Sequence, residues 1–190
     1  MGADTTPLAN SGHNMAPYAN RTIALVGLMG AGKSTVGKRL ADSLGRDFFD
    51  SDAEIEKAAG LSIADIFAIH GEAEFRRGER RVLERLLDQA PHVLATGGGA
   101  YLDPATRTLL REKAVTVWLN ADLETLWKRV SRRDTRPLLR DPDPKGVLRR
   151  LFHEREPVYS QADLSVRSHD GPHDRTVRAI LDALEGWRPA

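Results

Sequence analysis

Apolar and polar residues alternate along the chain in a pattern that predicts strands and helices in turn. Compact apolar runs predict strands at about 22–27, 48–49, 93–96, 115–119 and 163–167. Stretches with an apolar residue every three or four positions predict helices at about 33–44, 72–88, 104–112, 122–132, 146–155 and 173–186. Ser62 followed by Asp65 resembles a capping signal, and it predicts one more short helix that ends near Gly71. This order predicts an α/β fold: a parallel five-stranded sheet with helices on both faces.

The chain is expected to form one domain. Its 190 residues are enough for a single sizeable core, which we assign to residues 21–188. Residues 1–20 mix Gly, Pro, Ser, Asn and Thr without a period, which is typical of a flexible tail. Residues 134–146 form a polar stretch that is rich in Asp, Pro and Arg. We expect a loop there that closes over bound phosphates as a lid.

Composition narrows the classes of partner. The formal net charge is +1, which gives no general case for binding nucleic acid or membranes. No apolar run approaches the length of a membrane span. Cysteine is absent, which is compatible with a reducing compartment, and we expect a cytoplasmic protein. No long exposed apolar stripe stands out, so a monomer is expected.

The segment after the first predicted strand carries the strongest chemical signal. Gly27 to Ser34 fits the pattern G-x-x-x-x-G-K-[ST], and it lies between a predicted strand and a predicted helix. Backbone N–H groups in such a loop cradle phosphates, and the helix dipole favours their negative charge. The lysine would reach the β- and γ-phosphates, and the serine hydroxyl would bind magnesium. The expected ATP-binding residues here are Gly30, Ala31, Gly32, Lys33, Ser34 and Thr35.

Unusual residues also follow the second and third predicted strands. Asp50 and Asp52 flank Ser51, and an i, i+2 pair at a strand end would project both carboxylates to one side of the sheet. One could support the magnesium shell and the other accept a proton, although an ordinary Asp/Ser turn would look the same. Gly97, Gly98 and Gly99 end a buried strand, and their lack of side chains would let a ligand approach the backbone. Ligands of parallel sheets bind at these carboxyl ends.

Arginine offers candidate anion ligands elsewhere. Arg76 and Glu79 share a helix face at i, i+3, where the pair is either a carboxylate-binding group or a surface salt bridge. Arg136 precedes Pro137 in the polar loop, where it either reaches phosphates from a lid or is simply solvated. The six histidines show no metal-ligand spacing, and none is assigned a role.

Taken together, these motifs resemble those of the shikimate kinase family, and the resemblance covers roughly residues 20 to 186. It is carried by motifs in the family's order: the phosphate loop from Gly27 to Thr35, Phe49-Asp50-Ser51-Asp52, Gly71 to Arg77 followed by Glu79, Thr96 to Gly99, Arg136-Pro137-Leu138-Leu139, and Arg155-Glu156-Pro157-Val158-Tyr159. Each motif alone is weak, but the set is highly specific. One departure is Gly78, where the family usually has a bulkier residue in the substrate helix.

The resemblance implies a P-loop kinase fold and the transfer of the γ-phosphoryl of ATP to the 3-hydroxyl of shikimate, with Mg²⁺ as cofactor. It implies that Asp52 holds and deprotonates the hydroxyl and that Asp50 acts through the magnesium shell with Ser34. It also implies that Arg129 packs on adenine, with Arg132 as a second choice, and that Lys33 and Arg136 contact phosphates. The implied shikimate-binding residues, partly in a substrate region at about 52–88, are Asp52, Arg76, Glu79, Gly97, Gly98, Gly99 and Arg155.

Two other classes remain to be separated. A gluconate kinase of the same fold also binds a carboxylate and hydroxyls, but the triple glycine and the Arg155–Tyr159 run argue against it. A nucleotide-dependent switch or motor is the alternative from a different class. A GTPase should carry N-K-x-D or T-K-x-D, which is not found, and a motor ATPase should end an apolar strand with an acidic pair rather than Thr96-Gly97-Gly98-Gly99.

Overall fold

A five-stranded parallel sheet forms the centre of the computed structural model, which describes residues 16–132 and 141–189. The strand order is β2-β3-β1-β4-β5, and every neighbouring pair is parallel. The strands are β1 (Thr22–Val26), β2 (Phe48–Asp50), β3 (Val93–Ala95), β4 (Ala114–Asn120) and β5 (Leu164–Arg167). All five predicted strands are therefore confirmed, with ends that differ by at most one residue.

Burial explains why the central strands read as continuous apolar runs. All residues of β1 are buried, and Leu25 lies between Ala95 of β3 and Val117 of β4. A strand covered on both faces carries no polar alternation. The parallel register brings the carboxyl ends of neighbouring strands to one edge of the sheet, where the segments with unusual residues begin.

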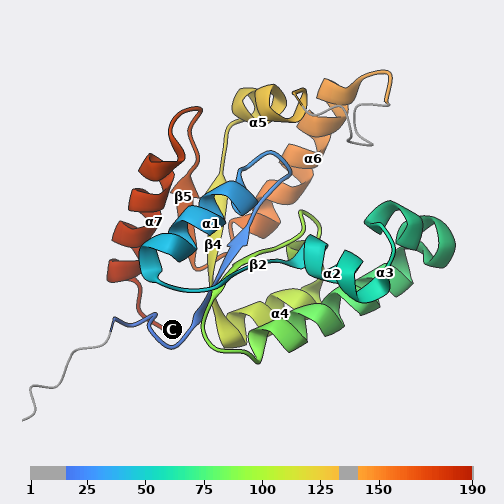
Figure 1. Ribbon diagram of the computed structural model, residues 1–190. Coiled ribbons are helices and arrows are strands. Elements are labelled where there is room, and N and C mark those ends of the chain that lie inside the picture. The colour runs from blue at the N-terminus through green and yellow to red at the C-terminus, as the bar shows by residue number, and fades with distance from the viewer. Residues whose placement is uncertain (1–15, 133–140, 190) are drawn as a thin grey trace, which may run out of the picture.

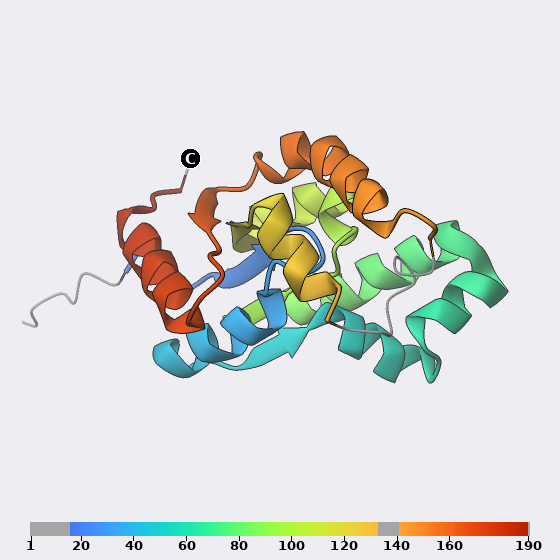
Figure 2. The ribbon, with the colours of Figure 1, turned by 90° about the horizontal axis from the view of Figure 1, so that it is seen from above.

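Helices cover both faces, as predicted. Helices α1 and α7 contact each other and the strands on one face, whereas α4 packs on β4 from the other face and contacts α3 (Figures 1 and 2). The helices are α1 (Lys33–Leu44), α2 (Ser51–Ala59), α3 (Ile63–Leu87), α4 (Pro104–Lys113), α5 (Leu123–Val130), α6 (Pro144–Tyr159) and α7 (His173–Gly186), with a short 3₁₀ turn η1 (Ala100–Leu102). No helix within the described residues is long and apolar enough to span a bilayer.

Helix α3 consists of two helical pieces that meet at a break, which matches the two helices predicted from the sequence. Ser62 caps the first piece by accepting a hydrogen bond from the Asp65 N–H at 3.1 Å. Gly71 then leaves helical geometry, with φ 77° and ψ 174°, and a second helical piece follows. The second piece packs through buried Phe75, Val82 and Leu83, so that one face of the predicted substrate helix is fixed against the core.

The structure differs from the sequence prediction at two helices, α2 and α6. Helix α2 was not predicted, and Asp52 lies in its first turn rather than at the end of a strand. Helix α6 begins at Pro144, so residues 144–146 of the predicted lid are helical, and it continues through Pro157 instead of ending before it. Residues 133–140 and 1–15 lie outside the described residues, whereas residues 16–20 of the predicted tail include a turn whose carbonyl groups at Tyr18 and Ala19 accept hydrogen bonds from Arg46.

Candidate active site

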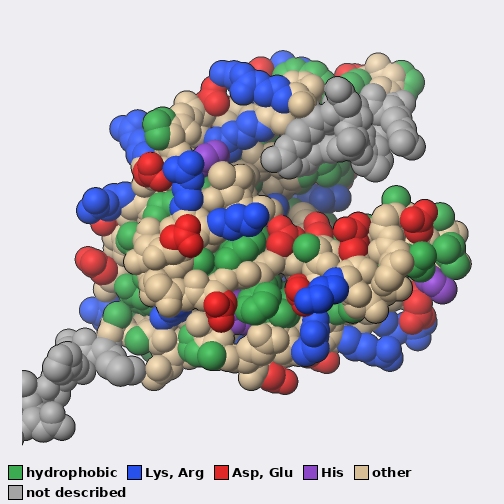
Figure 3. Space-filling model, viewed as in Figure 1, with side chains coloured by type: hydrophobic (Ala, Val, Ile, Leu, Met, Phe, Trp, Pro, Cys, Tyr) green, Lys and Arg blue, Asp and Glu red, His purple; other side chains and the backbone are tan. Residues whose placement is uncertain are grey.

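An open cleft lies at the carboxyl ends of the strands. Its volume is about 1030 Å³, and it is bordered by the phosphate loop, by the start of α2, by the glycine run after β3, by α5 and α6, and by the turn before α7. Figure 3 shows both basic and acidic side chains around this side of the molecule. The cleft brings together most of the residues singled out in the sequence, although they are far apart along the chain.

The phosphate loop has the conformation that its glycines predict. Gly30 and Gly32 have φ of 83° and 97°, a region that side chains with a Cβ rarely adopt. Gly32 is the N-cap of α1 and supplies no side-chain hydrogen bond, so the first N–H groups of that helix face the cleft without a side-chain cap. Lys33 donates hydrogen bonds from Nζ to the carbonyl oxygens of Gly27 at 2.7 Å and Leu28 at 3.1 Å. This loop is shaped to hold phosphate groups.

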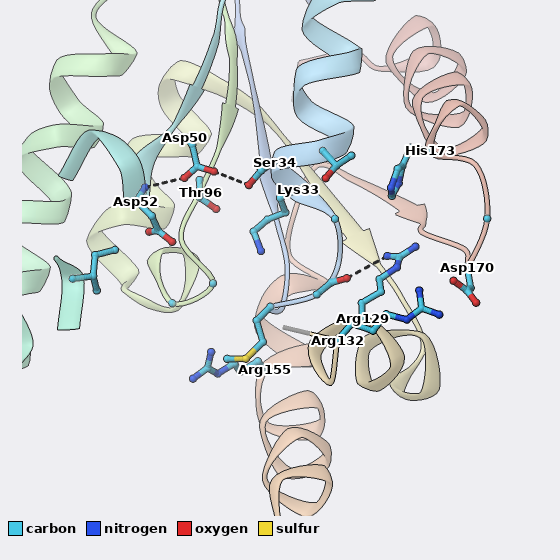
Figure 4. Close-up of a pocket in the computed structure, with 18 residues that line it drawn as sticks. Lys33, Ser34, Asp50, Asp52, Thr96, Arg129, Arg132, Arg155, Asp170 and His173 are labelled. Carbon is cyan, nitrogen blue, oxygen red and sulfur yellow. Dashed lines mark hydrogen bonds between the residues drawn. The ribbon is translucent and has the colours of Figure 1, made fainter. Parts of the chain in front are cut away.

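Ser34 and the two aspartates form a small polar cluster beside the loop. The Ser34 hydroxyl donates to Asp50 Oδ2 at 2.6 Å, and Asp50 Oδ1 accepts from the Asp52 N–H at 3.1 Å (Figure 4). Asp50 thereby caps α2, which turns Asp52 away from β2 and into the space that Lys33 also faces. Close packing of α1 on β2 supports the cluster, because a Cβ on Gly37 would lie 2.6 Å from the Phe48 ring.

The electrostatic environment of Asp52 suits a group that exchanges a proton. Burial raises the pKa of the Asp52 carboxyl above its ordinary value, and the negative charge of Asp50 raises it further. Lys33 and Arg76 oppose that shift with positive charge. A carboxylate with a raised pKa is a stronger base than an exposed one, so Asp52 is suited to accept a proton from a hydroxyl.

Arg76 and Glu79 form an ion pair that is not a surface salt bridge. Arg76 Nη1 lies 2.6 Å from Glu79 Oε2, and the Glu79 residue is only 1 % exposed. Burial raises the pKa of Glu79, while the hydrogen bond and charge of Arg76 oppose the increase. Glu72 adds a longer contact of 3.5 Å to Arg76 Nη2. These carboxylates orient the guanidinium beside Gly99, which lines the cleft, although Arg76 and Glu79 are not themselves among the lining residues.

Two glycines of the run leave room for the protein's own side chains. A Cβ on Gly97 would lie 2.5 Å from Asp52 Oδ1, and a Cβ on Gly99 would lie 2.5 Å from Arg76 Nη2. The sequence argument assigned the missing side chains to ligand access alone. In the structure the same absence also lets Asp52 and Arg76 approach the backbone. Gly98 and Gly99 line the cleft, so the glycine run both leaves room for a ligand and accommodates neighbouring side chains.

Helix α6 contributes to the opposite wall. Arg155 lines the cleft, and Tyr159, one turn later, donates a hydrogen bond to the Gly98 carbonyl. Tyr159 is 2 % exposed, and its ring stacks near Trp118 with 6.4 Å between ring centroids. The sequence motif that contains Tyr159 does not indicate which carbonyl its hydroxyl meets.

The far end of the cleft is lined by Arg129, Arg132, Asp170, Gly171 and His173. Arg129 Nη1 donates to the carbonyls of Gly30 and Ala31, each at 3.2 Å, and Nη2 donates to the carbonyl of His169 at 2.5 Å. Arg129 thus bridges the phosphate loop and the turn before α7. Its predicted contact with adenine stays a prediction. His173 was assigned no role, and only the tertiary structure brings it to this end of the cleft.

The cleft is also lined by residues to which the sequence motifs assign no individual role. Thr96 lines the cleft and donates from Oγ1 to the Leu25 carbonyl at 3.0 Å, which joins β3 to β1 just before the glycine run. Met29 and Ile63 supply apolar surface. Their residue types carry no chemical signal in a sequence. Arg136, the predicted phosphate contact from the lid, lies outside the described residues, so its role stays a prediction.

Comparison with known proteins identifies the relatives of this chain. Residues 29–185 match the family model described as shikimate kinase. A shikimate kinase of Caulobacter vibrioides is 57 % identical over 171 residues, covering 90 % of this chain and 86 % of the relative. A shikimate kinase of Rhodopseudomonas palustris is 47 % identical, covering 97 % of this chain and 94 % of the relative. The structure of a shikimate kinase from Acinetobacter baumannii in complex with shikimate superimposes with a TM-score of 0.83 at 39 % identity, covering 89 % of this chain and 95 % of that one.

Proposed function

This chain belongs to the shikimate kinase family and phosphorylates a hydroxyl of shikimate with ATP; we propose that the cleft described above carries out the transfer with the residue roles given below. The products are shikimate 3-phosphate and ADP, on the route to chorismate and the aromatic amino acids. The observation that supports the roles best is the convergence of Lys33, Asp52 and the glycine run on one cleft.

The phosphate half of the cleft binds ATP. The Gly30–Thr35 backbone and the start of α1 would hold the phosphates, and Lys33 would meet the β- and γ-phosphate oxygens. Arg136 would add positive charge to the transferring group, and Arg129 would contact the adenine. Phosphoryl transfer needs chiefly positioning and charge stabilisation, so no covalent nucleophile is required.

The residues beside the loop fit a magnesium ion. Ser34 and Asp50 present two oxygen atoms 2.6 Å apart, and Mg²⁺ prefers oxygen ligands from one or two protein groups together with phosphates. When bound, Mg²⁺ would neutralise phosphate charge. Asp50 and Ser34 would hold it directly or through water, and Asp50 at the same time caps α2 and keeps Asp52 in place.

The acceptor half of the cleft binds shikimate. Its carboxylate would lie between the guanidinium groups of Arg76 and Arg155, which offer paired N–H donors. Glu79 would hold Arg76 in place through their 2.6 Å ion pair, and Gly97 to Gly99 would supply backbone contacts. Asp52 would orient the 3-hydroxyl and take its proton as the oxygen attacks the γ-phosphorus.

We further propose that the enzyme acts as a monomer in the cytoplasm, where its co-substrate ATP is available, and that the part of the predicted lid that precedes α6, residues 134–143, acts as the lid. A coupled assay with shikimate, with gluconate and without acceptor, first with ATP and then with GTP, tests the function. ATP turnover that depends on shikimate is expected. Turnover with gluconate, or hydrolysis without acceptor, would contradict the proposal.

A further inference from the structure

Tyr159 is a buried polar side chain beside the glycine run to which the roles above assign no function. Its hydroxyl donates to the Gly98 carbonyl, and its ring is fixed by Trp118 at an interplanar angle of 27°. Burial raises the pKa of the Tyr159 hydroxyl, so it stays a hydrogen-bond donor in the physiological range. The side chain is thus held at both ends.

The bonded carbonyl belongs to a peptide unit that faces the proposed shikimate site. In a trans peptide, the C=O of Gly98 and the N–H of Gly99 share one plane and point in opposite directions. Fixing the Gly98 carbonyl toward α6 therefore fixes the Gly99 N–H to point away from α6. Among the hydrogen bonds between described residues, none is donated by the Gly99 N–H. The Gly99 N–H is therefore available to donate a hydrogen bond to a ligand.

The turn that contains this peptide leaves its orientation open to a further restraint, because glycine adds little of its own. Gly98 and Gly99 each lack a Cβ, so their backbone has more accessible conformations than any other residue type. The space beside Gly98 is not crowded, since a Cβ there would lie 3.6 Å from the Met29 nitrogen. Hydrogen bonds from Gly97 N–H to Ser51 Oγ at 2.9 Å and from Leu102 N–H to the Gly99 carbonyl at 3.0 Å hold the two ends of the run. The hydrogen bond from the Ala100 N–H to the Gly97 carbonyl at 3.1 Å closes a turn around Gly98 and Gly99, and within this turn the Gly98 carbonyl accepts its hydrogen bond from Tyr159.

We propose that Tyr159 is a positioning residue for the acceptor: by holding the Gly98 carbonyl it presents the Gly99 N–H to shikimate. Tyr159 follows Arg155 by four positions on α6, which places both on one helix face. One helix then supplies the arginine that binds the shikimate carboxylate and the hydroxyl that orients a backbone donor. A shift of α6 would change both contacts together.

The variant Tyr159→Phe removes the hydroxyl and keeps the ring against Trp118. Loss of one hydrogen bond of ordinary strength corresponds to about a fivefold change in affinity, so KM for shikimate should rise about fivefold or more. KM for ATP should change less than about twofold, because the phosphate loop keeps its contacts. Tyr101→Phe is the matched control: Tyr101 is 0 % exposed, and its hydroxyl has no hydrogen-bond partner among the described residues. Its KM values should equal those of the wild type.

Nuclear magnetic resonance of glycine-labelled protein gives a second readout that a purely structural role would not produce. In the wild type, shikimate should shift the Gly99 amide signal. In folded Tyr159→Phe, as checked by circular dichroism, that signal should be broadened or displaced before shikimate is added. An unchanged Gly99 signal, an unchanged KM for shikimate, equal rises in both KM values, or the same rise in Tyr101→Phe would each overturn the inference.

The inference rests on the proposed binding of shikimate at the glycine run, and the experiment separates the two. A wild-type protein that did not phosphorylate shikimate would contradict the proposed function itself. A wild type that does so, with a Tyr159→Phe variant that matches it in KM and in the Gly99 signal, would contradict only the role of Tyr159.

Discussion

Replacing Gly99 with alanine should damage shikimate binding while leaving the fold intact. The added Cβ would lie 2.5 Å from Arg76 Nη2, 3.0 Å from Nη1 and 3.1 Å from Cζ. Ordinary contacts begin near 3.4 Å, so the guanidinium must move by about 0.9 Å. The atoms that must move are at the end of a flexible side chain, and folding can accommodate them at little cost in free energy.

Shikimate binding should be more sensitive than folding to this displacement, because Arg76 is held by a 2.6 Å contact to buried Glu79. Moving the guanidinium removes it from the position in which it would grip the shikimate carboxylate. Loss of a hydrogen bond to a charged group costs about 1.5–3 kcal/mol, which corresponds to a rise in KM for shikimate of roughly 10- to 150-fold. The KM for ATP should stay within about twofold, because no atom of the phosphate loop is among the three nearest to the new methyl group.

The measurement is steady-state kinetics with each substrate varied, together with thermal unfolding. Gly78→Ala is the matched control on the helix that carries Arg76, because a Cβ there would meet nothing within 4 Å. Since alanine favours a helix over glycine by about 1 kcal/mol, this control should raise the melting temperature by roughly 2–4 °C and leave both KM values unchanged. A folded Gly99→Ala variant with wild-type KM for shikimate would refute the reasoning, as would a Gly78→Ala variant that lost shikimate binding.

Three further substitutions test the proposed roles. Lys33→Ala should abolish turnover in a protein that remains folded by circular dichroism, and near-normal activity would remove Lys33 from the ATP site. Arg155→Ala should weaken shikimate binding at least about tenfold in isothermal titration with little effect on ATP, and the reverse pattern would mean that the acceptor site is misplaced. Asp52→Asn should lower kcat by roughly 10²-fold or more. The raised pKa of Asp52 means that the folded protein favours the protonated carboxyl, so the wild type becomes less stable as pH rises through that pKa. Asparagine stays uncharged at every pH. Asp52→Asn should therefore have a higher melting temperature than the wild type at neutral pH, and the difference should shrink in acid. A gain independent of pH would contradict the burial argument.

The order of strands and helices, the phosphate loop and the family could all be predicted from the sequence. Buried parallel strands are apolar throughout and helices carry an apolar stripe, so both patterns can be recognised in a sequence. The five strands and the break at Gly71 were therefore predicted correctly. The phosphate loop could be recognised because its glycines, lysine and serine all lie in one short segment with fixed spacing. Family membership followed from several such local segments in a fixed order.

Contacts between residues that are distant in sequence could be identified only in the folded structure. The Arg76–Glu79 spacing fits a surface pair equally well, and burial of Glu79 depends on what packs against α3. The glycines at 97 and 99 are needed because Asp52 and Arg76 arrive from other elements, and the Tyr159 hydroxyl meets Gly98 across the fold. The sequence predicts Asp52 at the end of a strand, because a three-residue strand carries too little pattern to show that Asp50 ends it and caps α2. Local patterns report the backbone's own preferences, whereas contacts between elements depend on packing that no short window of sequence contains.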